Sequence, residues 1–420
     1  MNMTVSAGYK QSELGEIPEN WGFLTVQELI DKGGIVSHLD GNHGELYPRS
    51  NEFKNFGVPY IGANNFYSGH VDLQGCKFLS EEKASLFKKG VAQDGDILFA
   101  HNATVGPVAK LKTSIKYVIL STTATYFRTN GIILNNDYLL HFMRSELFSS
   151  QYKSIMSQST RNQVPITAQR KLVVVIPPIE EQREIAASLS DVDDLINSLN
   201  LLIAKKRDIQ QAAMQQLLTG QRRLPGFSGE WEVKRLGDLC KLGMGRTPSR
   251  LNSAYWGSGY KWLSIANLKG KVVSESSEQV TELAAKQMSL ISKGTLLMSF
   301  KLSIGRLAFA GCDLFTNEAI CSFNDLRVNA EYLYYALQRV DFSLYGKQAV
   351  KGFTLNKASL QLVEVAIPTR EEQAAIAAIL SDIDTELAAL EARCEKARQL
   401  KQGMMQELLT GRIRLAEQRS

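Results

Sequence analysis

The sequence lacks any apolar segment long enough to cross a membrane, and its first residues, MNMTVSAGYKQ, lack the apolar core of a secretion signal. A membrane-spanning helix needs about 20 consecutive apolar residues, and a signal peptide carries an apolar stretch after its charged start. We therefore expect a cytoplasmic protein that makes no contact with a membrane.

Cysteines are also few and scattered, and no two of them form a CxxC pair. Structural zinc sites and disulfide frameworks both need cysteines at short, regular spacings. This distribution argues against either feature. The five positions are Cys76, Cys240, Cys312, Cys321 and Cys394.

The sequence also lacks the usual catalytic motifs. It has no GxxxxGK[ST] phosphate loop, no GxGxxG after a strand and no GxSxG nucleophile motif. It shows no nuclease-like carboxylate cluster and no methyltransferase-like Asn-Pro-Pro-aromatic segment. His38, Asp40 and His43 are conceivable metal ligands, but no further ligand type follows nearby. We expect neither a catalytic residue nor a metal or other cofactor in this chain.

An internal repeat dominates what is present. IPPIEEQREIAASLSDVDD at 176–194 matches IPTREEQAAIAAILSDIDT at 367–385, and MQQLLTGQRRL at 214–224 matches MQELLTGRIRL at 405–415. Both pairs lie 191 residues apart, so about fifty residues repeat without a gap. Upstream matches continue with offsets that shrink from 210 to 194, which indicates small insertions between matched blocks. A variable unit followed by a near-invariant block therefore occurs twice.

The repeat and the charge distribution predict four segments. Residues 1–176 carry 17 basic and 15 acidic side chains, and residues 222–367 carry 19 and 12. The shared blocks, 177–221 and 368–420, carry 4 and 7, and 8 and 9. The two large units thus hold the positive charge, which suits a polyanionic partner, although chance scatter of surface charge would give the same totals.

The shared blocks have a helical pattern. Each starts after proline with two glutamates that suit a helix N-terminus, and each ends in Thr-Gly, where glycine can cap the helix. Ser190 and Ser381 have near capping-box spacing to an aspartate, so we expect a break or kink at each serine. The apolar spacing between these points is that of a heptad seam. The predicted seam residues are Leu189, Val192, Ile196, Leu199, Ile203, Leu217, Leu380, Ile383, Leu387, Leu390, Met404 and Leu408.

A single helix of this kind cannot bury its apolar stripe alone. The simplest partner is the other copy, and the returning chain would make the two helices antiparallel. Two separate helices, each packed on its own unit, are the alternative. A helix over 191–218 would be about 42 Å long, which corresponds to about twelve base pairs of DNA at ~3.4 Å each. The pair would then act as a ruler between the two units.

Each variable unit mixes strand-like runs with helical stretches in no regular alternation. The runs include 96–100, 116–127 and 172–177 in the first unit, and 295–300, 307–311 and 363–368 in the second. This pattern predicts an α+β fold with a curved, mostly antiparallel sheet.

Polar, turn-rich loops between the matched blocks are the candidate DNA contacts, because their side-chain types bond base edges and phosphates. Each of them alone is better explained as a solvated loop side chain, but their repeated placement favours DNA binding. The candidates are Asn64, Asn65, His101, Asn102, Thr104, Arg161, Asn162, Gln163, Arg246, Thr247, Ser249, Arg250, Asn267, Lys301, Ser303, Lys351, Asn356 and Lys357.

These features resemble the specificity subunit of type I restriction–modification systems. The resemblance rests on the IPP-x-EEQ-x-x-IA start and LLTG end of each block, on ELGEIPENW at 13–21 and on GRTPSRLNSAYWG at 245–257, and it covers essentially the whole chain. It implies two tandem target-recognition domains, each reading half of a split, asymmetric target in double-stranded DNA. It also implies paired helices that set the spacer between the two halves.

The resemblance further implies partner subunits, namely two copies of a methyltransferase subunit and the restriction subunits. S-adenosylmethionine, ATP and Mg²⁺ would be bound by those partners and not by this chain. The first unit lacks the GxTPS pattern of the second, so contacts do not transfer to it residue by residue. A coiled-coil scaffold with protein-binding ends is the alternative function. A nuclease is disfavoured by the missing carboxylates.

Overall fold

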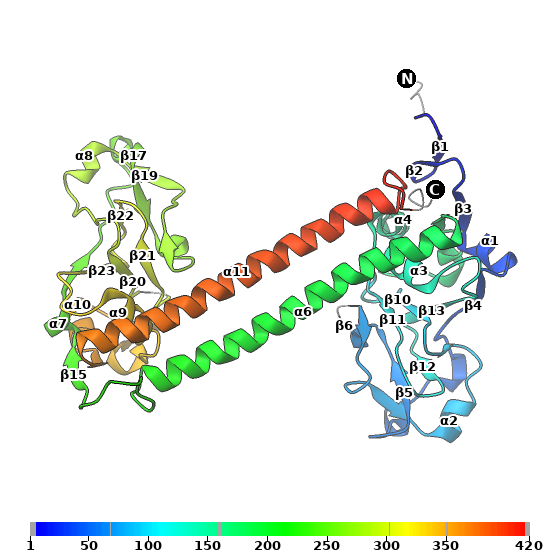
Figure 1. Cartoon of the computed structure of the whole chain (residues 1–420), viewed down its shortest axis with the longest axis horizontal. Coiled ribbons are helices and arrows are strands. Elements are labelled where there is room, and N and C mark those ends of the chain that lie inside the picture. Colours follow the sequence, from blue (N-terminus) through cyan, green and yellow to red (C-terminus); the bar gives the residue numbers. More distant parts are fainter. Residues whose placement is uncertain (1–5, 68, 158–160, 302, 350–351, 416–420) are drawn as a thin grey trace. The chain divides into compact units, whose positions relative to one another are not determined.

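The computed structural model describes residues 6–67, 69–157, 161–301, 303–349 and 352–415. The chain divides into two compact units (Figure 1). The first comprises residues 1–200 and 393–420, and the second comprises residues 201–392. Each unit contains one α+β domain together with parts of both long helices, α6 (Ile179–Leu217) and α11 (Arg370–Leu408).

The domain of the first unit contains fourteen strands and five α-helices among its described residues. The strands are β1 (Tyr9–Ser12), β2 (Gly15–Pro18), β3 (Gly22–Thr25), β4 (Ile35–Asp40), β5 (Val58–Ile61), β6 (Phe66–Tyr67), β7 (His70–Val71), β8 (Lys77–Leu79), β9 (Val91–Ala92), β10 (Ile97–Ala100), β11 (Val108–Lys110), β12 (Val118–Leu120), β13 (Ala124–Thr129) and β14 (Val173–Ile176). The helices are α1 (Val26–Asp31), α2 (Glu81–Ser85), α3 (Asn136–Met143), α4 (Glu146–Ser157) and α5 (Ile166–Gln169).

The domain of the second unit contains twelve strands and four α-helices among its described residues. The strands are β15 (Glu232–Arg235), β16 (Lys241–Met244), β17 (Trp256–Leu263), β18 (Val272–Val273), β19 (Glu278–Val280), β20 (Leu296–Ser299), β21 (Leu307–Ala310), β22 (Phe315–Thr316), β23 (Ile320–Asn324), β24 (Lys347–Ala349), β25 (Gly352–Thr354) and β26 (Glu364–Ile367). The helices are α7 (Leu236–Leu239), α8 (Glu282–Ala285), α9 (Ala330–Leu337) and α10 (Lys357–Gln361).

Both domains have the same sheet topology, which confirms the expected mostly antiparallel α+β fold. The main sheet has the order β11-β10-β13-β4 in the first domain and β21-β20-β23-β16 in the second, where β18 is added beside β21. A second sheet contains one parallel pair in each domain, β5 with β12 and β17 with β22. A two-stranded sheet joins a strand near the start of each domain to its last strand, β3 to β14 and β15 to β26.

The strand-like run at 116–127 forms two strands. β12 ends at Leu120, β13 begins at Ala124, and the two belong to different sheets. The amide of Ala124 donates to the carbonyl of Ser121 at 3.1 Å, which closes the turn between them. Apolar periodicity could not show this change of sheet, because both strands are buried and both are therefore apolar.

The two long helices are continuous, so the expected break at Ser190 and Ser381 is wrong. Each helix spans 39 residues; α6 starts directly after Pro178, and α11 starts two residues after Pro368. Each serine hydroxyl instead faces the domain. Ser190 lies 3.1 Å from Nε2 of His141 on α3, and Ser381 accepts a hydrogen bond from Lys271 at 3.1 Å. The terminal glycines, Gly220 and Gly411, have φ of 67° and 71°, as a glycine cap requires.

Within each unit, the N-terminal part of one long helix runs antiparallel to the C-terminal part of the other. In the first unit, Lys401 of α11 donates to Asp193 of α6 at 2.7 Å. In the second unit, Gln210 of α6 donates to Asp384 of α11 at 2.5 Å. Both pairs join residues that occupy matching places in the repeat, since 401 − 210 and 384 − 193 both equal 191. Lys401 and Gln210 are therefore equivalent donors to equivalent aspartates on the facing helix.

The predicted seam residues are all buried or half-buried. Those in the middle, such as Leu199 and Leu387, are 5% and 7% exposed. Those at the ends pack into the domain cores, Leu189 and Leu408 in the first unit and Leu217 and Leu380 in the second. The ends of each helix therefore stabilise a domain as well as the helix pair.

A buried glutamate anchors the start of each long helix. Glu181 is fully buried and accepts hydrogen bonds from Nε1 of Trp21 at 2.9 Å and from Arg414 at 2.6 and 2.9 Å. The second unit repeats this arrangement around Glu372. Trp231 donates to that carboxylate at 3.2 Å, and Arg223 donates at 2.6 and 2.7 Å.

The next residue of the motif, a buried glutamine, completes the anchor. Gln182 accepts from the amide of Asn135 at 2.9 Å and donates to the carbonyl of Pro177 at 2.9 Å. Gln373 bonds Asn329 and Pro368 in the same way, each at 2.8 Å. The second Glu and the Gln of the EEQ motif are therefore structural, and the first Glu lies exposed at the helix N-terminus.

Replacing the buried glutamate should strongly destabilise the second unit. We expect Glu372→Ala to lower the free energy of unfolding by about 1–3 kcal/mol, because Trp231 and Arg223 lose their buried hydrogen-bond acceptor. The exposed neighbour Glu371 provides a control, since Glu371→Ala should change the free energy of unfolding by less than about 0.5 kcal/mol. Urea unfolding of both variants measures this difference, and equal effects would contradict the anchor.

A buried histidine should make the first unit sensitive to acid. Burial, with the nearby Lys401 adding to it, lowers the pKa of His141 from 6.5 to about 4. The folded state thus binds a proton less readily than the unfolded chain, so stability is fully present above pH 6.5 and falls between pH 6.5 and 4. This histidine accounts for up to about 3 kcal/mol of that loss, at 1.36 kcal/mol per pKa unit.

The second unit has Tyr335 at the matching place, where its hydroxyl donates to Asp384 at 2.5 Å. We expect His141→Tyr to flatten the dependence of unfolding free energy on pH between 6.5 and 4, as measured by urea unfolding across that range. An unchanged slope would show that His141 does not titrate on unfolding.

Candidate nucleic-acid interface

Two candidate loops of the first domain are joined side by side, although about sixty residues separate them in sequence. Asn102 and Gln163 form an antiparallel bridge. The amide of Ala103 donates to the carbonyl of Asn162 at 3.2 Å, and Nδ2 of Asn162 donates to the carbonyl of Ala103 at 2.5 Å. The structure thus brings together residues 101–104 and 161–164, which the sequence could only propose separately.

The second domain repeats the same connections in its backbone. The amide of His101 donates to Thr123, and that of Phe300 donates to Ala319, both at 3.0 Å. The carbonyl of His101 accepts from the amide of Val164 at 2.8 Å, and the carbonyl of Phe300 accepts from that of Leu355 at 3.4 Å. Phe300 and Leu355 therefore join two segments of the second domain through backbone bonds like those of His101 and Val164 in the first.

A glycine lets a further loop approach this place in each domain. A Cβ on Gly41 would lie 2.1 Å from the carbonyl oxygen of Ser121, and one on Gly245 would lie 2.1 Å from that of Asn317. No other residue type fits such a close approach. The glycine amides bond equivalent carbonyls, those of Ala124 and Ile320. The loops that start at 41 and 245 are thereby fixed beside the turn before β13 and the turn before β23.

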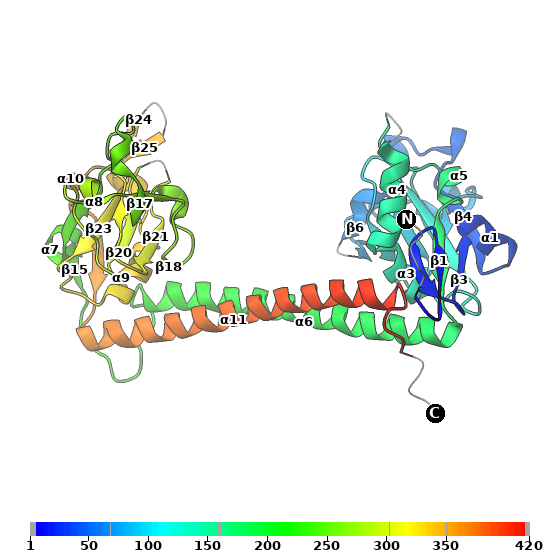
Figure 2. The same cartoon turned by 90° about the horizontal axis from the view of Figure 1, so that it is seen from above.

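In the second unit, β24 and β25 lie at the end of the domain away from the long helices (Figure 2), and Leu355, which bonds Phe300, follows β25 directly. The amide of Arg246 donates to the carbonyl of Thr316 at 2.8 Å, and the hydroxyl of Thr247 bonds the carboxylate of Glu318. That hydrogen bond lowers the pKa of Glu318. A hydrogen bond to the backbone of Glu318 and the positive charge of Lys301 lower it further, to a smaller extent. A carboxylate thus lies among the predicted cationic contacts, a feature that the sequence reasoning missed.

Of the first domain's candidates, four are exposed and four are not. Asn64, Thr104, Arg161 and Asn162 are exposed, whereas Asn102 and Gln163 are half-buried. Asn65 and His101 are only 5% and 6% exposed.

One amide from each domain holds a turn. Oδ1 of Asn65 accepts from the amide of Gly62 at 3.0 Å, and its counterpart in the second domain, Asn267, accepts from the amide of Ser264 at 2.9 Å. Both asparagines thus have a structural role that their sequence context, a matched apolar block, does not reveal.

In the second domain, Arg246, Ser249, Arg250, Asn356 and Lys357 are exposed. Thr247, Lys301 and Ser303 are half-buried. The side chain of Asn356 caps α10 by accepting from the amide of Ser359 at 2.8 Å. Lys351 lies outside the residues that the structure describes.

Arg250 is held by an aromatic and acidic clamp. Its guanidinium lies 3.8 Å from the centre of the Trp256 ring and 5.0 Å from that of Trp262, and it forms an ion pair with Glu278. Hydrogen bonding to Glu278 raises the pKa of Arg250 and lowers that of the carboxylate. The clamp fixes the guanidinium over the indole. In the sequence, this clamp is visible only as the aromatic YWG segment that follows Arg250, at 255–257.

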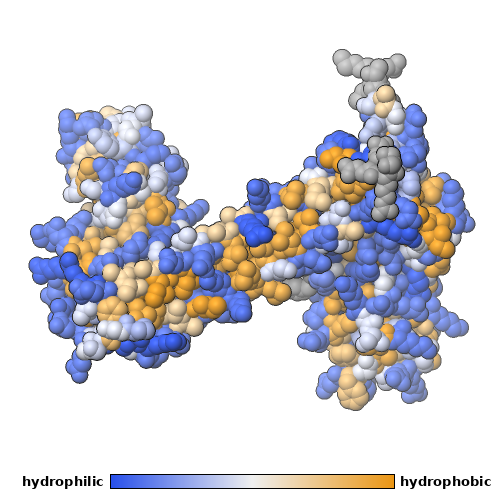
Figure 3. Space-filling model, viewed as in Figure 1, coloured by the Kyte–Doolittle hydropathy of each residue, from blue (hydrophilic) through white to orange (hydrophobic). Residues whose placement is uncertain are grey.

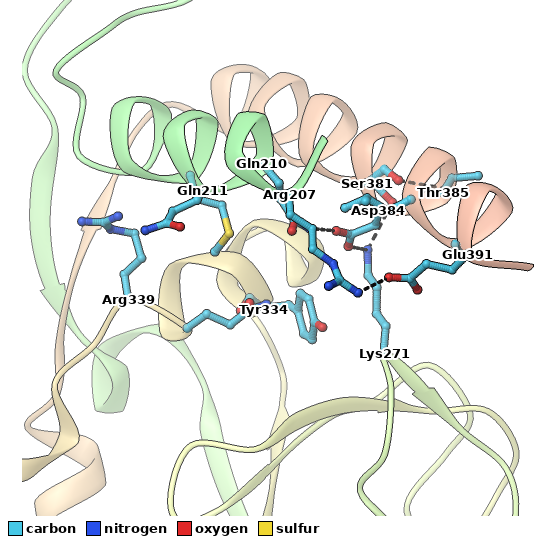
Figure 4. A pocket seen from close by; sticks show the side chains of 14 residues that line it. Arg207, Gln210, Gln211, Lys271, Tyr334, Arg339, Ser381, Asp384, Thr385 and Glu391 are labelled. Carbon is cyan, nitrogen blue, oxygen red and sulfur yellow. Dashed lines mark hydrogen bonds and ion pairs between the residues drawn. The ribbon is translucent and has the colours of Figure 1, made fainter. Parts of the chain in front are cut away.

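A groove of about 950 Å³ in the second unit lies between α9 and the segments of the two long helices (Figure 4). Ion pairs cross it, from Arg207 to Glu391 at 2.5 Å and from Lys271 to Asp384 at 3.6 Å. Nζ of Lys271 also lies 2.6 Å from the carboxylate of Glu331 and 4.7 Å from the centre of the Tyr335 ring. Each of these charges is paired within the protein, so the groove acts as a polar joint between the domain and the helices.

The two histidines that were conceivable metal ligands, His38 and His43, are committed to other contacts. Nε2 of His43 donates to the carbonyl of Leu120 at 2.7 Å, and Nε2 of His38 lies 3.2 Å from Oε1 of Gln169. Over the described residues, no three His, Cys, Asp or Glu side chains are grouped so that they could hold a metal ion. Over the same residues, no helix is both long enough and apolar enough to span a membrane.

Comparison with known proteins identifies the fold. Residues 18–205 and 228–401 match the family model described as the type I restriction modification DNA specificity domain. The putative type I restriction enzyme MjaX specificity subunit of Methanocaldococcus jannaschii is 25% identical, over 97% of each chain. The MjaIX specificity subunit of the same organism is 34% identical over 37% of this chain and 38% of its own.

Two solved structures share the fold over nearly the whole chain. The S subunit of a type I restriction–modification system from M. genitalium gives a TM-score of 0.59 at 14% identity and covers 93% of this chain and 96% of its own. A chain from a study of complex assembly and conformational transition in the type I R-M system gives 0.57 at 20% identity, over 94% and 99%. Because the family model matches both halves of the repeat, the chain belongs to the type I restriction–modification specificity subunits.

Proposed function

We propose that this chain reads a split, asymmetric DNA target, with each domain reading one half. The chain is a DNA specificity subunit and is itself non-catalytic. The observation that carries the proposal is the convergence, in both domains, of the same three loops on one place. The frame of the two domains is the same, yet the loop residues differ, with Asn102 and Gln163 in one and Lys301 and Asn356 in the other. Different side chains on one frame would select different bases.

The exposure of several candidates supports their assignment as DNA contacts. Exposed side chains of the converging loops, such as Arg161, Asn162, Arg246 and Lys357, lie at the surface, where DNA could contact them without unfolding of the domain. Arg250 would present a guanidinium already ordered by Trp256, which reduces the entropy lost on binding. The net positive charge of residues 222–367 would favour approach of the phosphates.

The long helices would set the spacer between the half-sites. Each is a continuous helix of 39 residues, or about 58 Å if straight. Such a helix is longer than the roughly 42 Å expected from residues 191–218, because it starts before the serine rather than after it. We infer four functional segments with the boundaries 1–176, 177–221, 222–367 and 368–420.

The helices would also bind the partner subunits. In the second unit, α6 leaves Leu201, Leu202 and Ile209 at 74%, 47% and 45% exposed, and apolar side chains are visible along the helices in Figure 3. Exposed apolar side chains of this kind suit a protein interface. Because the helical blocks are repeated, we infer two equivalent sites for two methyltransferase subunits, which would bind S-adenosylmethionine. Restriction subunits that use ATP and Mg²⁺ would join that complex in the cytoplasm.

The first experiment is a methylome. We expect co-expression of this chain with the methyltransferase subunit of its own system, in a host without adenine methylation, to produce methylation at a split, asymmetric motif. Long-read sequencing detects the modified adenines. Omitting this chain provides the control and should abolish the motif. Methylation that persists without the chain, or none at all when the partner is folded and bound, would contradict the proposal.

Lengthening the helix pair should lengthen the unread spacer. Inserting four residues after Leu201 and four after Ala392 adds about one helical turn, or roughly 6 Å, to both helices. It leaves the pairs Asp193–Lys401 and Gln210–Asp384 within their units. At ~3.4 Å per base pair, we expect a spacer about two base pairs longer with unchanged half-sites, measured by the same methylome. An unchanged spacer would contradict the ruler.

A further inference from the structure

A layer of four polar side chains lies directly beneath the converging loops of the first domain. None of the four is more than 6% exposed. They come from β4, from the loop after β10, from β13 and from α5, and we call them the polar layer: His38, His101, Thr125 and Gln169.

The same places in the second domain hold apolar side chains. His38 pairs with Phe127 in its sheet, as Leu242 pairs with Phe323. The loop contacts of His101 are those of Phe300. Thr125 matches Cys321 by strand register, and Gln169 matches Leu360 by the repeat offset of 191. All four apolar residues belong to one buried core cluster. The counterparts are Leu242, Phe300, Cys321 and Leu360.

Gln169 ties the polar layer to the loops. Its Nε2 donates to the hydroxyl of Thr125 at 3.1 Å and to the carbonyl of Val164 at 2.8 Å, while its Oε1 lies 3.2 Å from Nε2 of His38. The amide of Val164 in turn donates to the carbonyl of His101 at 2.8 Å. The side chain therefore connects two strands of the sheet with the segment 161–164, and through it with the segment 101–104.

The polar layer is costly for a core. Among the described residues, three ring nitrogens of this layer have no hydrogen-bond partner: both nitrogens of His101 and Nδ1 of His38. Buried polar atoms without partners destabilise a fold, and they are uncommon for that reason. Because the second domain fills these positions with apolar side chains, the fold itself does not require polarity there. The destabilising polar atoms lie directly under the segments that we assign to DNA reading.

We propose that the polar layer sets the positions of the first domain's loops for its DNA half-site, with His101 and Gln169 as positioning residues. The inference rests on the proposed function, in which this domain reads one half of a split target. Hydrogen bonds are directional, whereas apolar packing is not. Polar contacts can therefore hold a loop in a conformation that an apolar core would not select. The two domains would thus differ beneath their loops as well as in them. Ala103, which has a φ of 63° in this segment, shows that the loop has an unusual backbone there.

The sharpest test is His101→Phe, because it introduces the second domain's residue and breaks no hydrogen bond that the structure gives to the imidazole. We expect the thermal midpoint of the full chain to stay equal or rise, because two unpaired nitrogens leave the core. We also expect methylation of the native motif to fall at least tenfold, or the bases accepted at the first half-site to relax, with the second half-site unchanged. A thermal melt measures the midpoint, and the methylome of the complex measures the motif and the level of its methylation.

A second variant carries all four counterparts, His38→Leu, His101→Phe, Thr125→Cys and Gln169→Leu, and should show the same pattern more strongly. Phe300→His is the matched control in the second domain, and it should lower the midpoint and leave reading of the first half-site intact. Methylation at the native level, with an unchanged first half-site, in both stable variants would overturn the proposal. So would a lower midpoint together with weaker methylation at an unaltered motif, since that pattern describes a purely structural layer. An unsplit motif from the intact chain would instead overturn the proposed function.

Discussion

A carboxylate buried at the start of each long helix is the interaction on which the rest of this structure depends. Glu181 and Glu372 lie where water cannot solvate them, so each needs a cation and further donors. The cation comes from the segment that follows the other helix, Arg414 for the first and Arg223 for the second. The start of each helix is therefore completed by a residue that follows the end of the other. Each unit is closed by a residue far away in sequence.

The antiparallel pairing follows from the same logic. Asp193 and Asp384 face the domain on one side and the other helix on the opposite side, and each takes a donor from that helix, Lys401 in the first unit and Gln210 in the second. A shift of the two helices by one turn would separate these half-buried carboxylates from their donors on the facing helix. The pairing thus specifies one register, a role in which buried polar residues of helical pairs are well attested.

The duplicated frame gives two domains of one topology and leaves their loops free to differ. The close approaches of Gly41 and Gly245 and the backbone bonds of His101 and Phe300 are common to both domains. The side chains around them are not. Loops tolerate such change because their ends are fixed by the strands that they connect. A subunit built this way can change one half of its target while the other half keeps its geometry.

The sequence by itself determined the repeat, the two helical blocks with their glycine caps, the α+β class and the family resemblance, because these depend on local periodicity and on motifs that recur at one offset. It did not reveal that Ser190 faces a domain rather than breaking a helix, because capping spacing is also satisfied inside a continuous helix. It placed Asn65 among the DNA contacts, although its amide holds a turn. Only the tertiary structure decided which loops meet, which polar groups are buried and which charges are paired, since these depend on contacts between residues more than fifty positions apart.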